Sequence, residues 1–169
     1  MNPAAIILGL VTLQRLGELL LSRRNVERLK ARGAIEVGAD HYPLIVAVHA
    51  SWLLALWIFG RDQPVNWLAL TAYVAVQGVR LWVLVSLGGR WSTRIIVLPG
   101  EPLVACGPYR YVSHPNYVVV VTEIALLPLA LHLPIVALLF TILNAAVLAI
   151  RVRAESRALA AASGARARA

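Results

Sequence analysis

The sequence is poor in charged residues and in cysteine. Only 14% of its 169 residues are Asp, Glu, Lys or Arg, whereas 60% are hydrophobic, so the chain lacks the polar surface that a soluble domain of this length needs. A single cysteine, Cys106, excludes an intramolecular disulfide. The histidines also lack the spacing of metal ligands, and we expect no zinc or iron site at His41, His49, His114 or His132.

Long apolar runs indicate that the chain spans a membrane. The first run, over residues 4–21, has no basic segment before it and no A-x-A cleavage site, so we interpret it as a retained span. The sequence predicts an all-α integral membrane protein with about five transmembrane helices and a C-terminal helical hairpin. The predicted helices cover residues 3–22, 42–59, 65–87, 115–131 and 134–150. We expect one membrane domain over residues 1–160 and a disordered, Ala-rich tail over residues 161–169.

The basic residues predict the orientation of the chain in the membrane. Five lie after the first helix, three after the third and five after the fifth, against Arg61 alone on the opposite side. The positive-inside rule then places the N-terminus outside, and the C-terminus and both long connections in the cytoplasm. The net charge of +8 lies at the ends of apolar segments, and we therefore expect no nucleic-acid partner. The thirteen cytoplasmic residues are Arg23, Arg24, Arg28, Lys30, Arg32, Arg90, Arg94, Arg110, Arg151, Arg153, Arg157, Arg166 and Arg168.

Several polar side chains fall inside the predicted spans, where they are expected to face the bundle interior in pairs. Glu123 has no partner nearby in the sequence, and we expect it to pair with Arg80 or Arg15 across the bundle. Local alternatives exist: Arg15 and Glu18 can pair at i, i+3, and Arg80 can snorkel from its helix end. The remaining polar residues in the spans are Gln14, His49, Gln77 and Asn144.

The run GPYRYVSHPNY, residues 107–117, interrupts the apolar sequence with two prolines and a set of polar rings. Gly107-Pro108 predicts a turn, and His114-Pro115 predicts an extended residue followed by a helix start. A helix N-terminus suits a ligand carboxylate, and the neighbouring tyrosines suit a flat ring or a cation. The alternative is an interfacial belt formed by Tyr109, Arg110 and Tyr111.

With the later segment RVRAESRAL, residues 151–159, this run resembles the isoprenylcysteine carboxyl methyltransferase (ICMT) family of integral membrane enzymes. The resemblance covers most of the chain, and it is closest to a bacterial branch associated with type III polyketide synthases. Membrane sterol reductases carry a similar His-Pro-Asn-Tyr segment before their last helices.

The resemblance implies a cytoplasmic pocket for S-adenosylmethionine, with Arg151 contacting the acceptor substrate. Arg151 and Glu155 share a helix face at i, i+4. Two positions depart from the family pattern: Ser156 replaces its second Glu, and Ser113 replaces its Arg before His-Pro. Arg90 and Arg94 either line the same pocket or bind lipid headgroups. The implied cofactor-binding residues are Glu101, Pro102, Leu103, Val104, Tyr109, His114, Pro115, Asn116, Tyr117 and Glu155.

By this resemblance the protein is an S-adenosylmethionine-dependent O-methyltransferase in the inner membrane of a bacterium. Its substrate would carry a lipid tail and a carboxylate or acidic hydroxyl, as in a prenylcysteine, an alkylpyrone or an alkylresorcinol. The second hypothesis is a membrane NADPH-dependent sterol-type reductase. The third is a non-catalytic bundle or transporter, which predicts Gly-interrupted spans or an internal repeat, and the sequence has neither.

Overall fold

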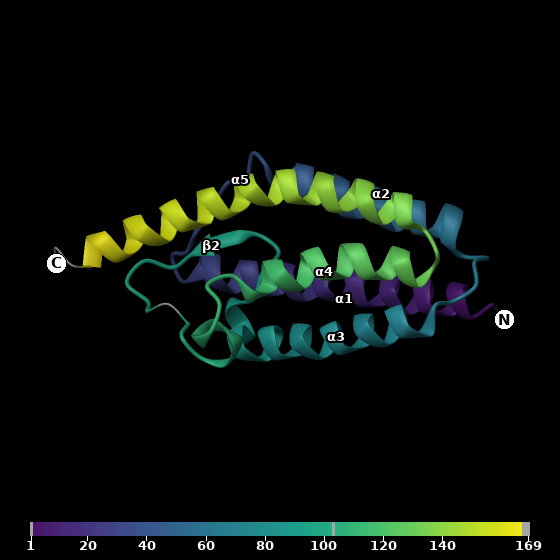
Figure 1. The fold of residues 1–169 in the computed structure, drawn as a ribbon. Helices are drawn as coiled ribbons and strands as arrows, with labels where there is room; N and C mark the ends of the chain where they lie inside the picture. Colours follow the sequence, from purple (N-terminus) through teal and green to yellow (C-terminus); the bar gives the residue numbers. More distant parts are fainter. Residues whose placement is uncertain (1, 103, 167–169) are drawn as a thin grey trace.

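The computed structural model describes residues 2–102 and 104–166 of the chain. Its α-helices lie side by side along one long axis, and the two ends of the chain lie at opposite ends of the bundle (Figure 1). The helices are α1 (Pro3–Ala31), α2 (Tyr42–Gly60), α3 (Trp67–Leu87), α4 (Pro115–Ala130) and α5 (Pro134–Arg166). Two short strands, β1 (Ile35–Val37) and β2 (Ile95–Val97), and two 3-10 turns, η1 (Gly88–Arg90) and η2 (Gly107–Arg110), complete the described part.

The helices have the length and composition of membrane spans. In the described part of the chain α1, α2, α3 and α5 are each long and apolar enough to cross a bilayer. The remaining helix, α4, has 16 residues and is about 24 Å long, which is shorter than the hydrocarbon layer. Large apolar side chains such as Leu68 and Ile135 are mostly exposed on the outside of the bundle, as lipid-facing residues are. The chain is an all-α integral membrane protein, as the sequence predicts.

Two helices continue past their predicted ends. The hydropathy of the sequence locates the end of an apolar run, whereas the helix itself continues through any good helix formers that follow. For this reason α1 extends from residue 22 to Ala31 through Arg, Glu, Leu and Lys. In the same way α5 extends through Ala and Arg to Arg166, into the segment predicted as a disordered tail. Residues 167–169 of that segment lie outside the described residues.

The start of α3 lies slightly later than predicted because Asn66 caps it. The Asn66 side chain accepts a hydrogen bond from the Ala69 amide at 3.1 Å, so the helix begins at Trp67 and not at residue 65.

The predicted hairpin between the last two helices is present. The α4 helix ends at Ala130, and Pro134 begins α5 after three intervening residues. His132 adopts a positive φ of 54°, and the Leu133 amide donates to the Pro128 carbonyl at 2.8 Å. This tight turn satisfies the last carbonyls of α4 and sends α5 back alongside it.

All five helices meet in an apolar core. Trp52 and Leu56 from α2 pack with Leu8 from α1, Ile124 from α4 and Phe140 from α5. The Trp52 indole is 1% exposed and donates to the Ile124 carbonyl at 3.2 Å, so its polar atom is satisfied inside the core. The bundle is therefore packed tightly in its middle, and any open space lies towards its ends.

A network of ion pairs joins α1, α3 and α4 inside the bundle. Arg80 donates to Glu18 and, at 2.6 Å, to Glu123. Arg15 donates to Glu18 at 3.1 Å and to Glu123 at 2.9 Å. Gln77 adds a hydrogen bond to Glu123 at 2.7 Å. Both expected partners of Glu123 and the local Arg15–Glu18 pair are thus confirmed.

The snorkelling alternative for Arg80 is wrong. The residue is 5% exposed, and its guanidinium points into the bundle, because two carboxylates there compensate its charge better than the more distant interface. His49, in turn, is an interior histidine whose Nδ1 lies 2.8 Å from the Ile45 carbonyl.

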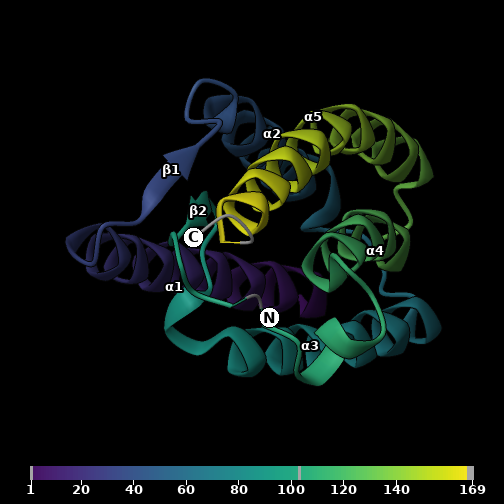
Figure 2. The same ribbon diagram turned by 90° about the vertical axis from the view of Figure 1, so that its left-hand side faces the viewer.

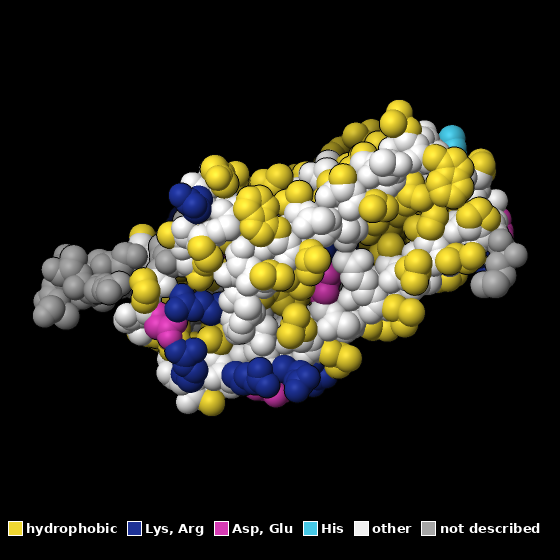
Figure 3. Space-filling model, turned by 90° about the horizontal axis from the view of Figure 1, so that it is seen from below, with side chains coloured by type: hydrophobic (Ala, Val, Ile, Leu, Met, Phe, Trp, Pro, Cys, Tyr) yellow, Lys and Arg dark blue, Asp and Glu magenta, His cyan; other side chains and the backbone are white. Residues whose placement is uncertain are grey.

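A small sheet near one end of the bundle was not predicted from the sequence. Strand β1 follows α1 and pairs antiparallel with β2, which follows α3, with Ile35 opposite Val97. Both strands contact α5, and Figure 2 shows them from the end of the molecule at which the chain terminates. The sheet ties together the connection after α1 and the connection after α3, and in Figure 3 Lys and Arg side chains gather at this end of the molecule.

Candidate active site

A turn after α3 directs the chain back towards the bundle. Gly107 has φ 57°, and a Cβ at this position would lie 2.0 Å from the Ser86 hydroxyl of α3. Only glycine combines this backbone conformation with such a close approach. The turn η2 follows and buries Pro108, which brings Tyr109 and His114 back over the ends of the helices.

The start of α4 follows the rule for residues before proline. His114 lies outside the helical region, with φ −132° and ψ 62°, although it is not the extended residue that the sequence predicts, and Pro115 is the first residue of the helix and is buried. The His114 ring stacks on the Tyr117 ring, one helical turn later, with centroids 5.4 Å apart. Two stacked aromatic rings therefore lie at the start of α4.

Charged residues in the second half of α5 lie next to the start of α4. Tyr117 donates a hydrogen bond to the Glu155 carboxylate at 2.6 Å, and His114 Nδ1 lies 3.5 Å from the same oxygen. Arg151 lies one turn earlier on α5, is 5% exposed, and donates to the Thr93 carbonyl at 2.9 Å. The beginning of α4, the end of α5 and the chain before β2 thus meet in one place.

These elements enclose a cavity of about 810 Å³ at this end of the bundle. Nine of the eleven site residues predicted from the sequence line it. The two others are Pro115, which is buried in the first turn of α4, and Leu103, which lies outside the described residues. The nine lining residues are Glu101, Pro102, Val104, Tyr109, His114, Asn116, Tyr117, Arg151 and Glu155. The structure brings these residues together, and their binding roles remain predictions.

Glu101 differs from the other predicted residues in how its carboxylate is used. It forms ion pairs with Arg32 and with Arg90, and the Arg90 guanidinium also donates to the Pro102 carbonyl at 2.7 Å. The Glu101 carboxylate therefore holds the segment before η2 against α1 and η1.

Arg90 and Arg94 both line the cavity, although their charges are engaged with other protein groups. Arg94 forms an ion pair with Glu36 of β1, and its guanidinium lies 4.3 Å from the centre of the Tyr42 ring. Hydrogen bonds from Lys30 and Arg94 lower the pKa of the Glu36 carboxyl below its ordinary value. Arg94 thus fastens the wall of the cavity to the start of α2.

Some lining residues were not predicted from the sequence. Trp91, Thr93 and the residues of β2 form one wall, and Leu29 of α1 closes another. Their position depends on the pairing of two strands that lie far apart in the sequence. One signal was present: Trp91 is a large aromatic residue next to the basic GGR segment at the end of a span.

Residues that line the cavity carry buried polar atoms without a hydrogen-bond partner. Within the described residues these include the Trp91 indole nitrogen and the Asn116 side-chain oxygen, and similar atoms occur away from the cavity on Arg15, Tyr73 and Asn144. An unpaired buried donor or acceptor costs about 1–3 kcal/mol, so a polar ligand that supplies both partners would be stabilised here. Burial, helped by the nearby Glu155 charge, raises the pKa of Tyr109 to about 12, so its phenol stays protonated and can donate a hydrogen bond.

The structure defines an integral membrane protein whose cavity is built from the ends of its spans, and known sequences identify its family. Residues 67–161 match the model of the isoprenylcysteine carboxyl methyltransferase (ICMT) family, a family of methyltransferases. The chain is 42% identical to the uncharacterized protein YpbQ of Bacillus subtilis, over 91% of this chain and 95% of the relative. The chain belongs to the ICMT family.

A second relative is more distant. An uncharacterized protein of Haemophilus influenzae is 25% identical, over 86% of this chain and 88% of its own length. No solved structure matches the chain.

Proposed function

We propose that the protein is an S-adenosylmethionine-dependent O-methyltransferase that acts on a lipid-tailed substrate at the cytoplasmic face of a bacterial inner membrane. The observation that carries the proposal is the single cavity formed by the start of α4, the charged end of α5 and the segment before η2. Family membership supports the class of reaction. The basic residues at this end of the bundle support its cytoplasmic location.

The cavity fits S-adenosylmethionine in size and chemistry. Its volume of about 810 Å³ lies within the range of small-molecule sites, about 300–1,000 Å³. The unpaired Asn116 oxygen can accept from an amino group, and the unpaired Trp91 nitrogen can donate to a ring nitrogen or a carboxylate. Glu155, held by Tyr117, is placed to accept from hydroxyl or ammonium groups.

When bound, the cofactor supplies a methyl group on a positively charged sulfur. Arg151 would orient the acceptor, since a guanidinium can bind a carboxylate while it keeps its hydrogen bond to the Thr93 carbonyl. A carboxylate acceptor is ionised at neutral pH and requires no general base. The contribution of this chain is then mainly to position the acceptor and to exclude water.

The location of the cavity supports a lipid-tailed acceptor. The walls of the cavity include residues of the membrane-spanning helices and of the polar connections between them. The polar head of a lipid can therefore enter the cavity while its apolar tail remains among the spans. Both a prenylcysteine and an alkylpyrone or alkylresorcinol have this form.

Cofactor choice separates this proposal from a membrane NADPH-dependent reductase. Purified protein in detergent is titrated with S-adenosylhomocysteine and, separately, with NADPH, and binding is followed by calorimetry. We expect saturable binding of S-adenosylhomocysteine alone. Binding of NADPH without S-adenosylhomocysteine would establish the reductase hypothesis in its place.

The role of Arg151 is tested with Arg151→Gln and, as a matched control, Arg153→Gln, an exposed arginine on the same helix. Loss of an oriented charged donor lowers turnover by about 10²–10³, while S-adenosylhomocysteine affinity stays nearly unchanged. Turnover is measured as transfer of a labelled methyl group to prenylcysteine or alkylpyrone in vesicles. Equal turnover of Arg151→Gln and Arg153→Gln would place the acceptor elsewhere.

A further inference from the structure

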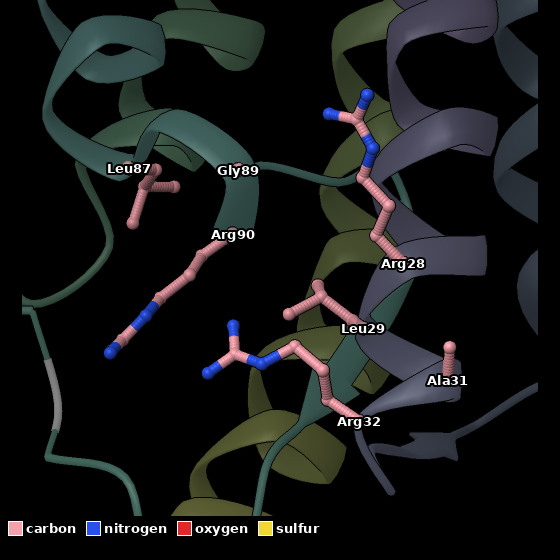
Figure 4. Close-up of a pocket in the computed structure, with 7 residues that line it drawn as sticks. All are labelled: Arg28, Leu29, Ala31, Arg32, Leu87, Gly89 and Arg90. Carbon is pink, nitrogen blue, oxygen red and sulfur yellow. The ribbon is translucent and has the colours of Figure 1, made fainter.

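A second hollow, of about 640 Å³, lies beside the cavity and has a different character. Figure 4 shows Arg28 and Arg32 projecting from α1 on one side, with Arg90 of η1 on the other. Leu29 lies between Arg28 and Arg32, Leu87 lies beside Arg90, and Ala31 and Gly89 complete the lining. We call these seven residues the arginine groove, and Leu29 and Leu87 its apolar floor. Three arginine side chains thus line one hollow together with apolar side chains.

The charges of the arginine groove are only partly compensated. Glu101 is paired with Arg32 and Arg90, whereas Arg28 has no ion-pair partner within the described residues. Three positive charges against one negative charge leave a net charge of +2. Arg28 and Arg32 also stand at i, i+4 on one helix face, where like charges repel. A bound anion would relieve this repulsion.

The groove lies at the depth of lipid headgroups. The apolar run of α1 ends at Leu21, and Arg28 follows about 10 Å further along the helix axis. Helical side chains lean towards the N-terminus, and Figure 4 shows Arg28 extending in that direction, back towards the bilayer. The headgroup layer begins where the apolar run ends, so the Arg28 guanidinium reaches lipid phosphates and the apolar floor faces the start of their chains.

From these observations we propose that the arginine groove is a binding site for the phosphate group of an anionic membrane lipid. Arginine is well suited to this ligand because its fork of N–H groups matches phosphate oxygens. The floor of Leu29 and Leu87 accommodates the glycerol and the first methylene groups. Glu101, which lines the neighbouring cavity, pairs with Arg32 and Arg90 and so competes with a phosphate for their guanidinium groups. This proposal does not depend on the reaction that the neighbouring cavity catalyses.

Native mass spectrometry of the purified full-length protein tests the site. Protein in detergent is mixed with short-chain phosphatidylglycerol or phosphatidylcholine, and retained lipids are counted over a titration. The variants are Arg28→Gln, Arg23→Gln and Glu101→Gln. Arg23 is the matched control, because it is an exposed arginine of α1 that does not line the groove. All four proteins are first compared by circular dichroism.

We expect the wild type to retain one phosphatidylglycerol in preference to phosphatidylcholine. Loss of a charge-assisted hydrogen bond in Arg28→Gln weakens this binding about tenfold, whereas Arg23→Gln changes it by about twofold or less. Glu101→Gln tightens the binding because the internal competitor is removed, an effect that a merely structural ion pair would not produce.

Three results would overturn the proposal. Equal losses in Arg28→Gln and Arg23→Gln would show a general effect of charge. Equal retention of the two lipids, which both carry a phosphate, would show that the net negative charge of the lipid is not what is recognised. Displacement of the lipid by an equal concentration of inorganic phosphate would show a site for soluble anions.

Discussion

Two polar clusters in this bundle use the same kinds of residue in opposite ways. In the middle of the bundle, Arg15 and Arg80 are matched by Glu18 and Glu123, and each cation contacts both carboxylates. At the end of the bundle, Arg151 and Glu155 share a helix face and line a cavity, yet no ion pair joins them within the described residues. All four charges of the first cluster are in ion pairs, and we call it complete; in the second cluster Arg151 and Glu155 are not paired with each other, and we call it incomplete.

The difference teaches how buried charge can be interpreted in a membrane protein. An intramembrane ionisable residue is a functional candidate by default, so the sequence left the central residues as candidates, whereas the family resemblance implied the roles of Arg151 and Glu155. Geometry separates them, because a charge that is fully compensated by protein groups has little capacity left for a substrate. Trp91 and Asn116, which line the cavity, carry buried polar atoms without a partner, but so do Arg15 and Asn144 elsewhere in the bundle, so the cavity is distinguished by its volume and its lining and not by such atoms alone.

The largest expected effect breaks the complete cluster. Glu123→Gln leaves Arg15 and Arg80 with one carboxylate between them, and an uncompensated buried charge lowers the free energy of unfolding by about 3–5 kcal/mol. Thermal unfolding in detergent, followed by circular dichroism, measures the loss.

The double variant Glu123→Gln/Arg15→Gln restores a balance of one cation and one carboxylate, and it should recover part of the lost stability. A melting temperature of Glu123→Gln equal to that of the wild type would contradict the structural role of the network.

An intermediate effect is expected at the incomplete cluster, on ligand binding and not on folding. Glu155→Gln removes a charged acceptor from the cavity, so affinity for S-adenosylhomocysteine falls about tenfold while stability changes by about 1 kcal/mol or less. Calorimetric titration and thermal unfolding separate the two quantities. Glu27→Gln, at an exposed carboxylate of α1, is the control and should change neither. A large loss of stability in Glu155→Gln, with affinity for S-adenosylhomocysteine unchanged, would show that Glu155 has a structural role, as Glu123 does.

The smallest effect concerns the ion pairs around Glu36, which are complete like the central network but lie outside the spans. The folded-state pKa of Glu36 is below its ordinary value of 4.5, so its stabilisation is present above that value and is lost as pH falls through the folded-state pKa. Glu36→Gln should lower stability by about 1 kcal/mol or less at pH 7. The difference in stability between Glu36→Gln and the wild type should be smaller at a pH below the folded-state pKa of Glu36 than at pH 7. Thermal unfolding at the two pH values measures this difference. A stability difference that is equally large in acid would show that the substitution acts through packing and not through the charge of Glu36.

Much of the fold could be predicted from the sequence, for reasons that particular residues illustrate. Apolar runs located the spans, Pro115 and Pro134 marked helix starts, and the short link at His132 implied the hairpin. The partners of Glu123 followed from the high cost of an unpaired carboxylate in the membrane. These features depend on local sequence or on a small number of possible partners.

The missed features depend on contacts between distant segments. Strands β1 and β2 have three residues each, too few to give a periodic signal, and they form only because the bundle brings the two connections together. The wall formed by Trp91 and Thr93 depends on the same contact. The direction of the Arg80 side chain required the positions of Glu18 and Glu123 on two other helices.

The shortness of α4 has a consequence for the surrounding bilayer. A helix of 16 residues cannot match the hydrocarbon thickness that its neighbours span, so lipids beside it must compress or tilt. The bilayer next to His114, where α4 begins, is therefore expected to be thinner than it is beside the longer helices.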